Sequence, residues 1–182
     1  MKVVQTAIPD VVGFEPVVRG DERGYFFEAW RRDGFAAHGV EPAFVQENQS
    51  SSGRGVLRGL HYQIEQTQGK LVRVVSGRVF DVAVDLRRSS PTFGRWAGLE
   101  LSAENRRSFW VPPRFGHGFY VLSEQAEFVY KCTDYYAPEH ERVIRFDDPE
   151  IGIAWPLLAG VPTILSPRDE AGLPLRRAEV FP

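Results

Sequence analysis

The densest group of side chains that could do chemistry lies between Gln46 and Gln63 and contains Asn48, Arg58 and His61. A histidine, with a reference pKa of about 6.5, can take up or release a proton near neutrality. A single histidine in a β protein is more often a core or surface residue. Here, however, several cations crowd the same stretch and favour an anionic ligand beside the histidine; they are Arg58, Lys70 and Arg73.

The local backbone around His61 is predicted to be a strand over residues 55–64. On a regular strand, Leu57, Gly59 and His61 share one face, and the intervening residues, Arg58 among them, share the other. Glycines in a strand let a ligand or another backbone approach closely. The sequence therefore predicts that this strand forms a wall of a binding pocket.

A second group, over residues 110–119, contains Arg114 and His117. Two histidines on different strands raise the question of a bound metal. The usual first motif of metal-binding jelly rolls has two histidines one residue apart, and Gln63 occupies the place of the second one. Catalytic zinc sites usually have three protein ligands, and this set falls short of that number. We therefore predict no metal site.

Two further groups follow in the last third of the chain. Residues 128–141 contain Tyr130 and Tyr136, whose hydroxyls could donate protons or reach a polar partner at the rim of a barrel. Cys132 is not predicted to be a nucleophile, because it lies in the middle of a strand with no histidine beside it in sequence. The segment from Ser166 to Asp169 is predicted to be a loop, where aspartate is also common for turn reasons.

Short apolar runs separated by turn residues predict the elements that position these groups. The expected strands cover residues 11–19, 25–30, 55–64, 70–75, 79–86, 96–101, 107–111, 118–122 and 128–133, and a short helix is expected at 31–38. In residues 79–86, Phe80 and Val82 fall on one face, and Val79 and Asp81 on the other, less hydrophobic face. Many strands with almost no helix indicate an all-β sandwich or barrel of antiparallel strands. We expect one domain over residues 1–182, with short peripheral helices and an irregular C-terminal extension.

Composition narrows the class of protein. The 182 residues carry a formal net charge of -2, which argues against a protein that coats nucleic acid or an anionic membrane. Small anions remain possible ligands, because they need only a local cluster of cations. A single cysteine, with neither a signal peptide nor an apolar run of membrane-spanning length, predicts a cytoplasmic protein.

Taken in order, the motifs resemble those of the dTDP-4-dehydrorhamnose 3,5-epimerase family over nearly the whole chain. They are residues 21–28 (DERGYFFE), 46–48 (QEN), 57–63 (LRGLHYQ), 69–70 (GK), 79–87 (VFDVAVDLR), 90–94 (SPTFG), 116–119 (GHGF), 130–136 (YKCTDYY), 151–156 (IGIAWP) and 166–169 (SPRD). The resemblance implies a cupin-type jelly roll that works without a metal or cofactor and assembles as a homodimer.

The resemblance also implies a role for each site residue. His61 is similar to the family's general base, Asp169 to the carboxylate that orients it, Tyr130 to the acid on the opposite face of the sugar, and Lys70 to the cation that steadies an enolate oxygen. Other positions resemble those that contact the nucleotide, the diphosphate or the sugar, with Phe26 and Tyr136 flanking the thymine; these positions are Arg23, Phe26, Glu28, Gln46, Asn48, Arg58, His117, Tyr136, Glu141 and Arg168.

The implied reaction is epimerisation at C3 and C5 of dTDP-4-keto-6-deoxy-D-glucose, on the route to dTDP-L-rhamnose. A ketone at C4 makes the neighbouring hydrogens removable as protons, because the carbanion is delocalised as an enolate. Inversion requires a base and an acid on opposite walls of the pocket. Single-site epimerisation at C3 or C5, a non-catalytic sugar-nucleotide-binding cupin and a metal-dependent cupin are the alternatives.

The sequence leaves three structural questions open. Asp81 competes with Asp169 as the partner of His61. Glu47 is bulkier and more acidic than the apolar residue expected between Gln46 and Asn48. We further expect a strand near the N-terminus, which includes Phe26 and Glu28, to cross to the pocket of the partner subunit.

Overall fold

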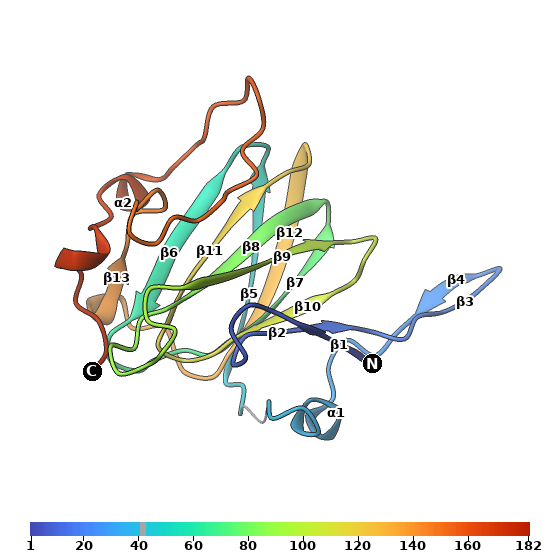
Figure 1. Cartoon of the computed structure of the whole chain (residues 1–182). Coiled ribbons are helices and arrows are strands. Elements are labelled where there is room, and N and C mark those ends of the chain that lie inside the picture. The colour runs from blue at the N-terminus through green and yellow to red at the C-terminus, as the bar shows by residue number, and fades with distance from the viewer. Residues whose placement is uncertain (41–42) are drawn as a thin grey trace.

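Two antiparallel sheets packed face to face form the body of the protein in the computed structural model, which describes residues 1–40 and 43–182 (Figure 1). One sheet has the strand order β1 (Lys2–Gln5), β2 (Val12–Glu15), β10 (Ser108–Val111), β7 (Lys70–Ser76), β12 (Gln125–Cys132), β5 (Gln46–Gly53). The other has the order β13 (Glu141–Val143), β6 (Leu57–Gln63), β11 (Phe115–Val121), β8 (Arg78–Asp85), β9 (Trp96–Ser102). This is a cupin-type jelly roll, so the predicted fold class is confirmed.

The main core lies between the two sheets. Val72 and Phe128 project into it from the six-stranded sheet, and Phe119 and Val121 project from the five-stranded sheet. Alternate residues of a strand point to opposite faces, so each strand supplies one inward row of apolar side chains. Burial of these rows holds the sheets together, at roughly 25 cal/mol for each Å² of apolar surface removed from water.

Most of the chain after β12 covers the outer face of the five-stranded sheet (Figure 1). Val82 and Val84 on β8 pack there against Ile144, Leu175 and Phe181. The segment contains the short elements η1 (Pro138–His140), α2 (Pro167–Glu170) and η2 (Leu175–Arg177). Both faces of β8 are therefore buried, and the face that the sequence marks as less hydrophobic is the one that points between the sheets.

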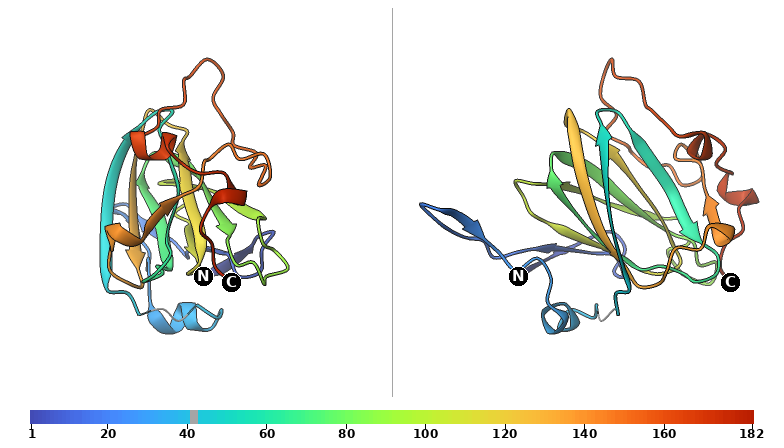
Figure 2. Two further views of the ribbon diagram at one scale, coloured as in Figure 1. Left: turned by 90° about the vertical axis from the view of Figure 1, so that its left-hand side faces the viewer. Right: turned by 180° about the vertical axis from the view of Figure 1, so that it is seen from behind.

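A hairpin projects from the body near the N-terminus. It consists of β3 (Arg19–Asp21) and β4 (Gly24–Phe26), and Figure 1 and the right-hand view of Figure 2 show it away from the two main sheets. Tyr25 and Phe26 on this hairpin are 62% and 71% exposed. Helix α1 (Arg32–Ala36) follows, and its Phe35 packs on Phe14 against the outer face of the six-stranded sheet.

Several predicted boundaries were wrong. The strand expected over residues 11–19 ends at Glu15, before Pro16, and β11 begins at Phe115 rather than at 118. Proline cannot donate to a strand ladder, which accounts for the first difference. Strands β1, β5 and β13 were not predicted, and β5 has the sequence QENQSSSG, without one apolar residue. Its inward side chains face a polar cavity instead of the apolar core.

The regular alternation predicted for β6 was also wrong. In the pairing with β11, His61 lies opposite His117, whereas Arg58 lies opposite Phe119, so three residues of one strand span two of the other. Gly59 has a φ of +126° at this bulge, and a Cβ there would lie 2.5 Å from the Cα of Gly118. A bulge shifts the side chains that follow it. Arg58 and His61 consequently share the inward face.

No helix among residues 1–40 and 43–182 is long and apolar enough to cross a membrane.

Candidate active site

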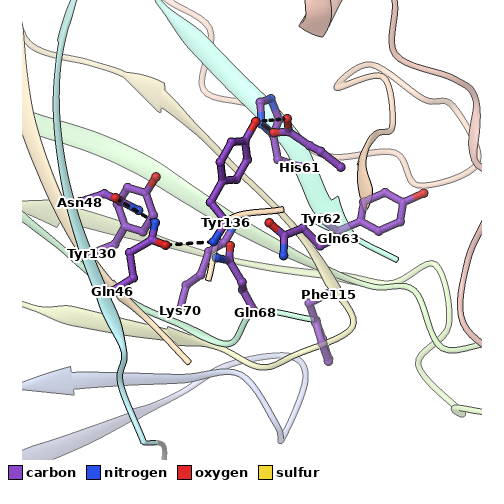
Figure 3. Close-up of a pocket in the computed structure, with 11 residues that line it drawn as sticks. Gln46, Asn48, His61, Tyr62, Gln63, Gln68, Lys70, Phe115, Tyr130 and Tyr136 are labelled. Carbon is purple, nitrogen blue, oxygen red and sulfur yellow. Dashed lines mark hydrogen bonds and ion pairs between the residues drawn. The ribbon is translucent and has the colours of Figure 1, made fainter. Parts of the chain in front are cut away.

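A cavity of about 310 Å³ opens between the two sheets, at the end where β5, β6, β7 and β12 come together (Figure 3). Polar side chains form most of its wall. The lining residues are Gln46, Asn48, His61, Tyr62, Gln63, Gln68, Lys70, Phe115, Tyr130, Tyr136 and Glu141. The cavity therefore gathers residues from four of the predicted motifs.

His61 lies on the β6 wall between two carboxylates. Its Nε2 is 2.5 Å from Oδ1 of Asp169, and its Nδ1 is 3.1 Å from Oε1 of Glu141. Burial of the ring opposes a positive charge, but the hydrogen bonds with Asp169 and Glu141 outweigh it and raise the pKa of His61 above its ordinary value. A raised pKa keeps the ring charged over a wider pH range.

Asp169 is fixed by the helix that carries it. At the N-cap of α2, the Ser166 hydroxyl oxygen accepts the backbone N–H of Asp169 at 3.2 Å and the backbone N–H of Ser166 donates to Oδ2 of Asp169 at 3.3 Å, which is a capping box. The Ser166 hydroxyl also donates to Oδ2 at 2.6 Å. The N–H of Gly59 donates to Oδ1 at 3.1 Å. Burial alone would raise the pKa of Asp169, but the hydrogen bonds from His61, Ser166 and Gly59 lower it to about 2. The carboxylate is thus held in the ionised form.

Asp81 has a different partner, which answers the first question left open by the sequence. His117 places Nε2 at 2.9 Å and 3.1 Å from the two oxygens of Asp81, and both side chains are buried between the sheets. Burial raises the pKa of Asp81. Asp169 is therefore the carboxylate in contact with Nε2 of His61, as the sequence favoured.

The six-stranded sheet forms the opposite wall. Tyr130 on β12 and Lys70 on β7 face the cavity from this sheet. Burial raises the pKa of the Tyr130 phenol and lowers the pKa of the Lys70 ammonium. On β5, Gln46 donates to the side chain of Asn48 at 3.1 Å, and the Asn48 amide points to the sulfur of Cys132. Base and acid candidates thus stand on facing walls.

The outward-facing side chains of β5 and β12 do not contribute to the cavity. Glu47 forms an ion pair with Lys131 on the outer surface of the sheet. Its acidity therefore does not disturb the cavity.

The rim near β13 carries Tyr136, Glu141 and Arg168. The Tyr136 hydroxyl donates to Oε2 of Glu141 at 2.8 Å, and Arg168 donates to the same oxygen and to the Tyr136 hydroxyl. Arg58 on β6 donates to the hydroxyl of Ser52 on β5 at 3.0 Å. An aromatic ring at the rim could stack on a nucleotide base, and the cationic side chains there could bind a diphosphate.

The family model described as dTDP-4-dehydrorhamnose 3,5-epimerase matches residues 5–177. The chain belongs to this family. It is 58% identical, over the full length of both chains, to the dTDP-4-dehydrorhamnose 3,5-epimerase of Pseudomonas aeruginosa, and 50% identical to that of Escherichia coli over 93% of this chain and 92% of the relative.

Solved structures of family members superpose closely. One is the dTDP-6-deoxy-D-glucose-3,5-epimerase of Legionella pneumophila in complex with dTDP-4-keto-L-rhamnose, with a TM-score of 0.94, 52% identity and coverage of 98% and 94% of the two chains. Another is a 3'-monoepimerase from Streptomyces bikiniensis in complex with dTDP-quinovose, with a TM-score of 0.85, 38% identity and coverage of 92% and 84%. The fold is thus shared by epimerases that differ in the number of centres they invert.

Three of the residues that the family resemblance assigns to substrate binding lie outside the cavity of their own chain. Arg23 pairs with Asp21 on the projecting hairpin, Phe26 is exposed there, and Glu28 contacts Arg31 at 3.5 Å. Four of the remaining assigned residues line the cavity; they are Gln46, Asn48, Tyr136 and Glu141. Arg168 bonds two of these lining residues, and His117 lies opposite His61 in the strand pairing. Arg58 bonds Ser52 on β5.

Two contributors to the site were not identified from the sequence. Gln63 is buried and holds the segment that carries Tyr136, because its amide bonds the N–H of Ala137 and the carbonyl of Tyr135. The loop predicted from Ser166 to Asp169 was wrong, because Ser166 is the N-cap of helix α2, and a serine three residues before an aspartate is a recognisable capping signal. Among the described residues, no three His, Cys, Asp or Glu side chains converge as metal ligands would.

Replacement of Ser166 by alanine is expected to lower kcat by about 10-fold, because one hydrogen bond to the charged Asp169 is lost. The missing N-cap also lowers the free energy of unfolding by about 1 kcal/mol. Ser166→Thr keeps the hydroxyl and is the matched control, which should restore most of kcat. A Ser166→Ala variant that melts at lower temperature but keeps its full kcat would limit this serine to a structural role.

Proposed function

We propose that this protein catalyses epimerisation at C3 and C5 of dTDP-4-keto-6-deoxy-D-glucose, in the synthesis of dTDP-L-rhamnose, by proton removal and reprotonation from the opposite face. The observation that carries the proposal is the placement of His61 and Tyr130 on facing walls of one cavity. Inversion of a carbon centre needs a base on one side and an acid on the other. Membership of the family supports the choice of substrate, and so does the dTDP-4-keto-L-rhamnose bound in the Legionella pneumophila relative of the same fold.

His61 is the proposed base. It removes the hydrogen next to the C4 ketone, and the electron pair moves onto the ketone oxygen as an enolate. Asp169 stabilises the imidazolium that forms, as the carboxylate does in a catalytic triad. Lys70 faces the same cavity and stabilises the enolate oxygen, whose charge exists only after proton removal.

Tyr130 is the proposed acid. A tyrosine phenol, with a reference pKa of about 10, is protonated near neutrality, and burial raises the pKa of Tyr130 further. It can therefore give its proton to the carbanion from the wall opposite His61. A sugar-nucleotide-binding protein without catalysis would need the rim cations and aromatics, but it would have no need of a paired base and acid. The residues of the cavity therefore favour an isomerase that works without a cofactor.

The test follows exchange of the substrate hydrogens. Proton NMR of dTDP-4-keto-6-deoxy-D-glucose in D₂O with the EDTA-treated protein should show deuterium at both C3 and C5, together with the inverted product. Deuterium at one carbon alone would instead identify a single-site epimerase, a function that the similarity to a monoepimerase also allows. Tight binding without exchange at either carbon would refute the catalytic proposal.

We also propose that residues 1–182 form one domain that works as a homodimer in the cytoplasm. The first strand and the last residues support a single domain, because β1 pairs in the six-stranded sheet and Phe181 packs on the five-stranded sheet. The exposed hairpin supports the dimer, because Phe26 and Arg23 are presented away from the cavity of their own chain. In a dimer this hairpin would complete the pocket of the partner.

Complementation between two inactive variants tests the exchange of hairpins. A mixed dimer of His61→Ala and Arg23→Ala subunits contains one pocket in which both the base and the hairpin are intact, provided that hairpins cross. Activity should then appear on mixing, although each variant alone is impaired. If each hairpin serves its own subunit, the mixture stays as impaired as its components, and a monomer in light scattering would refute the dimer itself.

A further inference from the structure

Both ring nitrogens of His61 face carboxylate oxygens. Asp169 lies at Nε2 and Glu141 lies at Nδ1, at 2.5 Å and 3.1 Å. A neutral imidazole has one N–H donor and one lone pair, so one of the two contacts would place a lone pair against an anionic oxygen. An imidazolium donates to both carboxylates. The geometry therefore fits a base that already holds its proton, and such a base cannot accept another from a sugar carbon.

The two carboxylates differ in how freely they can leave. Asp169 is 3% exposed and is held by bonds from Gly59, from Ser166 and from the ring. Glu141 lines the cavity, and its other oxygen accepts hydrogen bonds from Tyr136 and Arg168 on the exposed rim. The Nδ1 side of His61 is therefore the side open to the cavity. Glu141 stands where the hydrogen of a bound sugar would have to arrive.

We propose that Glu141 is an internal placeholder, which bonds Nδ1 of His61 in the free enzyme and is displaced towards Tyr136 and Arg168 when the sugar binds. This rests on the proposed epimerase function. On displacement, the proton on Nδ1 passes to solvent, and His61 keeps the N–H that it donates to Asp169. The freed lone pair then faces the substrate. Binding of an uncharged sugar moiety would thus release a proton, and the base becomes active only when the site is filled.

Several other charged or titratable groups face this part of the cavity. Asp169 from α2 raises the pKa of His61, Lys70 from β7 lowers it, and the pair of His117 and Asp81 lies on the neighbouring strands β11 and β8. Tyr130 on β12 and Arg168 on α2 complete the set. Replacement of Glu141 by glutamine leaves all of them in place and removes only the negative charge at Nδ1.

The acidic limbs of the pH profiles of kcat and kcat/KM should lie at different pH values, in an order that the proposal fixes. The acidic limb of kcat/KM reports the base in the free enzyme, and that of kcat reports it in the complex. Glu141 raises the pKa of His61 only in the free enzyme, so the limb of kcat/KM should lie at higher pH than that of kcat. In Glu141→Gln the limb of kcat/KM should move to lower pH and approach the limb of kcat.

Proton release on binding gives a direct test. The probe is dTDP-glucose, in which C4 carries a hydroxyl, so no enolate can form. Its diphosphate is esterified at both ends and lacks the secondary ionisation near pH 6 of a terminal phosphate. Calorimetry in buffers of different ionisation enthalpy counts the protons, at a pH on the acidic limb of kcat/KM. The wild type should release up to about one proton per site.

The Glu141→Gln variant should release far less, and Glu139→Gln, on the exposed turn two residues away, should behave as the wild type. A wild type that binds dTDP-glucose without proton release would overturn the placeholder, and so would a Glu141→Gln variant that releases as many protons as the wild type. Deuterium exchange into the keto substrate by the wild type is measured in parallel. Its absence would count against the epimerase function, whereas exchange without proton release would count against the placeholder alone.

Discussion

The His61→Ala variant is expected to lose about 10²–10⁴-fold in kcat for epimerisation, and deuterium exchange at C3 and at C5 should fall together. Both exchanges should fall because one base serves both carbons. His61 faces the cavity from β6, and among the described residues it is the only histidine that lines the cavity. Removal of the base prevents enolate formation at either carbon. Proton NMR in D₂O follows exchange and inversion in one sample.

The control for this variant is His38→Ala, which changes an exposed histidine after α1 that does not line the cavity. It should keep wild-type rates. Binding of dTDP-glucose by His61→Ala, measured by calorimetry, shows whether the pocket is still formed. Exchange that persists at one carbon in His61→Ala would mean that a second base serves that carbon, and His117 with Asp81 would be the next pair to examine.

The fold class could be predicted from the sequence because apolar and polar residues alternate along several strands. The faces of β8 were assigned from alternation alone, and Val82 and Val84 do share one buried face. Alternation did not reveal that both faces are covered, because that depends on an irregular C-terminal segment with no periodic pattern of its own. Strand β5 was not predicted because it lines a polar cavity and therefore has no row of apolar side chains that a pattern could reveal.

The candidate site divides in the same way. His61, Lys70 and Tyr130 could be chosen from their residue types and from the family resemblance, and the cavity brings them together. The contact of Glu141 with His61 could not be predicted, because it depends on the pairing of β13 with β6, two strands nearly 80 residues apart in sequence. The bulge at Gly59 likewise depends on how β6 meets β11, and strict alternation placed Arg58 on the wrong face.

One consequence of this arrangement is that proton removal and inversion are separable. His61 is held by the five-stranded sheet and Tyr130 by the six-stranded sheet, so each group belongs to a different wall. A proton lost to His61 can return from the same side, which regenerates the original sugar. Only delivery from the Tyr130 wall inverts the centre. A variant that lacks the acid should therefore still form the enolate.

The Tyr130→Phe variant is accordingly expected to lower the rate of inversion by about 10²–10⁴-fold, while deuterium still enters the substrate with retained configuration. The ring and its packing on Phe128 remain, so the change removes little besides the hydroxyl. Proton NMR separates the outcomes, because the deuterated substrate keeps the H1 and H2 chemical shifts of the starting sugar, whereas the inverted product is a different diastereomer with chemical shifts of its own. Tyr135→Phe, which alters an exposed tyrosine, is the matched control and should leave both rates unchanged.

Equal losses of exchange and inversion in Tyr130→Phe would contradict this assignment, because they would mean that the phenol is already needed when the enolate forms. Retained inversion would instead show that another group, or water, delivers the proton from that wall. The pH dependence of inversion gives a second, independent test of Tyr130. Burial raises the pKa of Tyr130, so the phenol should stay protonated, and inversion should persist, to a pH above that at which an exposed tyrosine ionises.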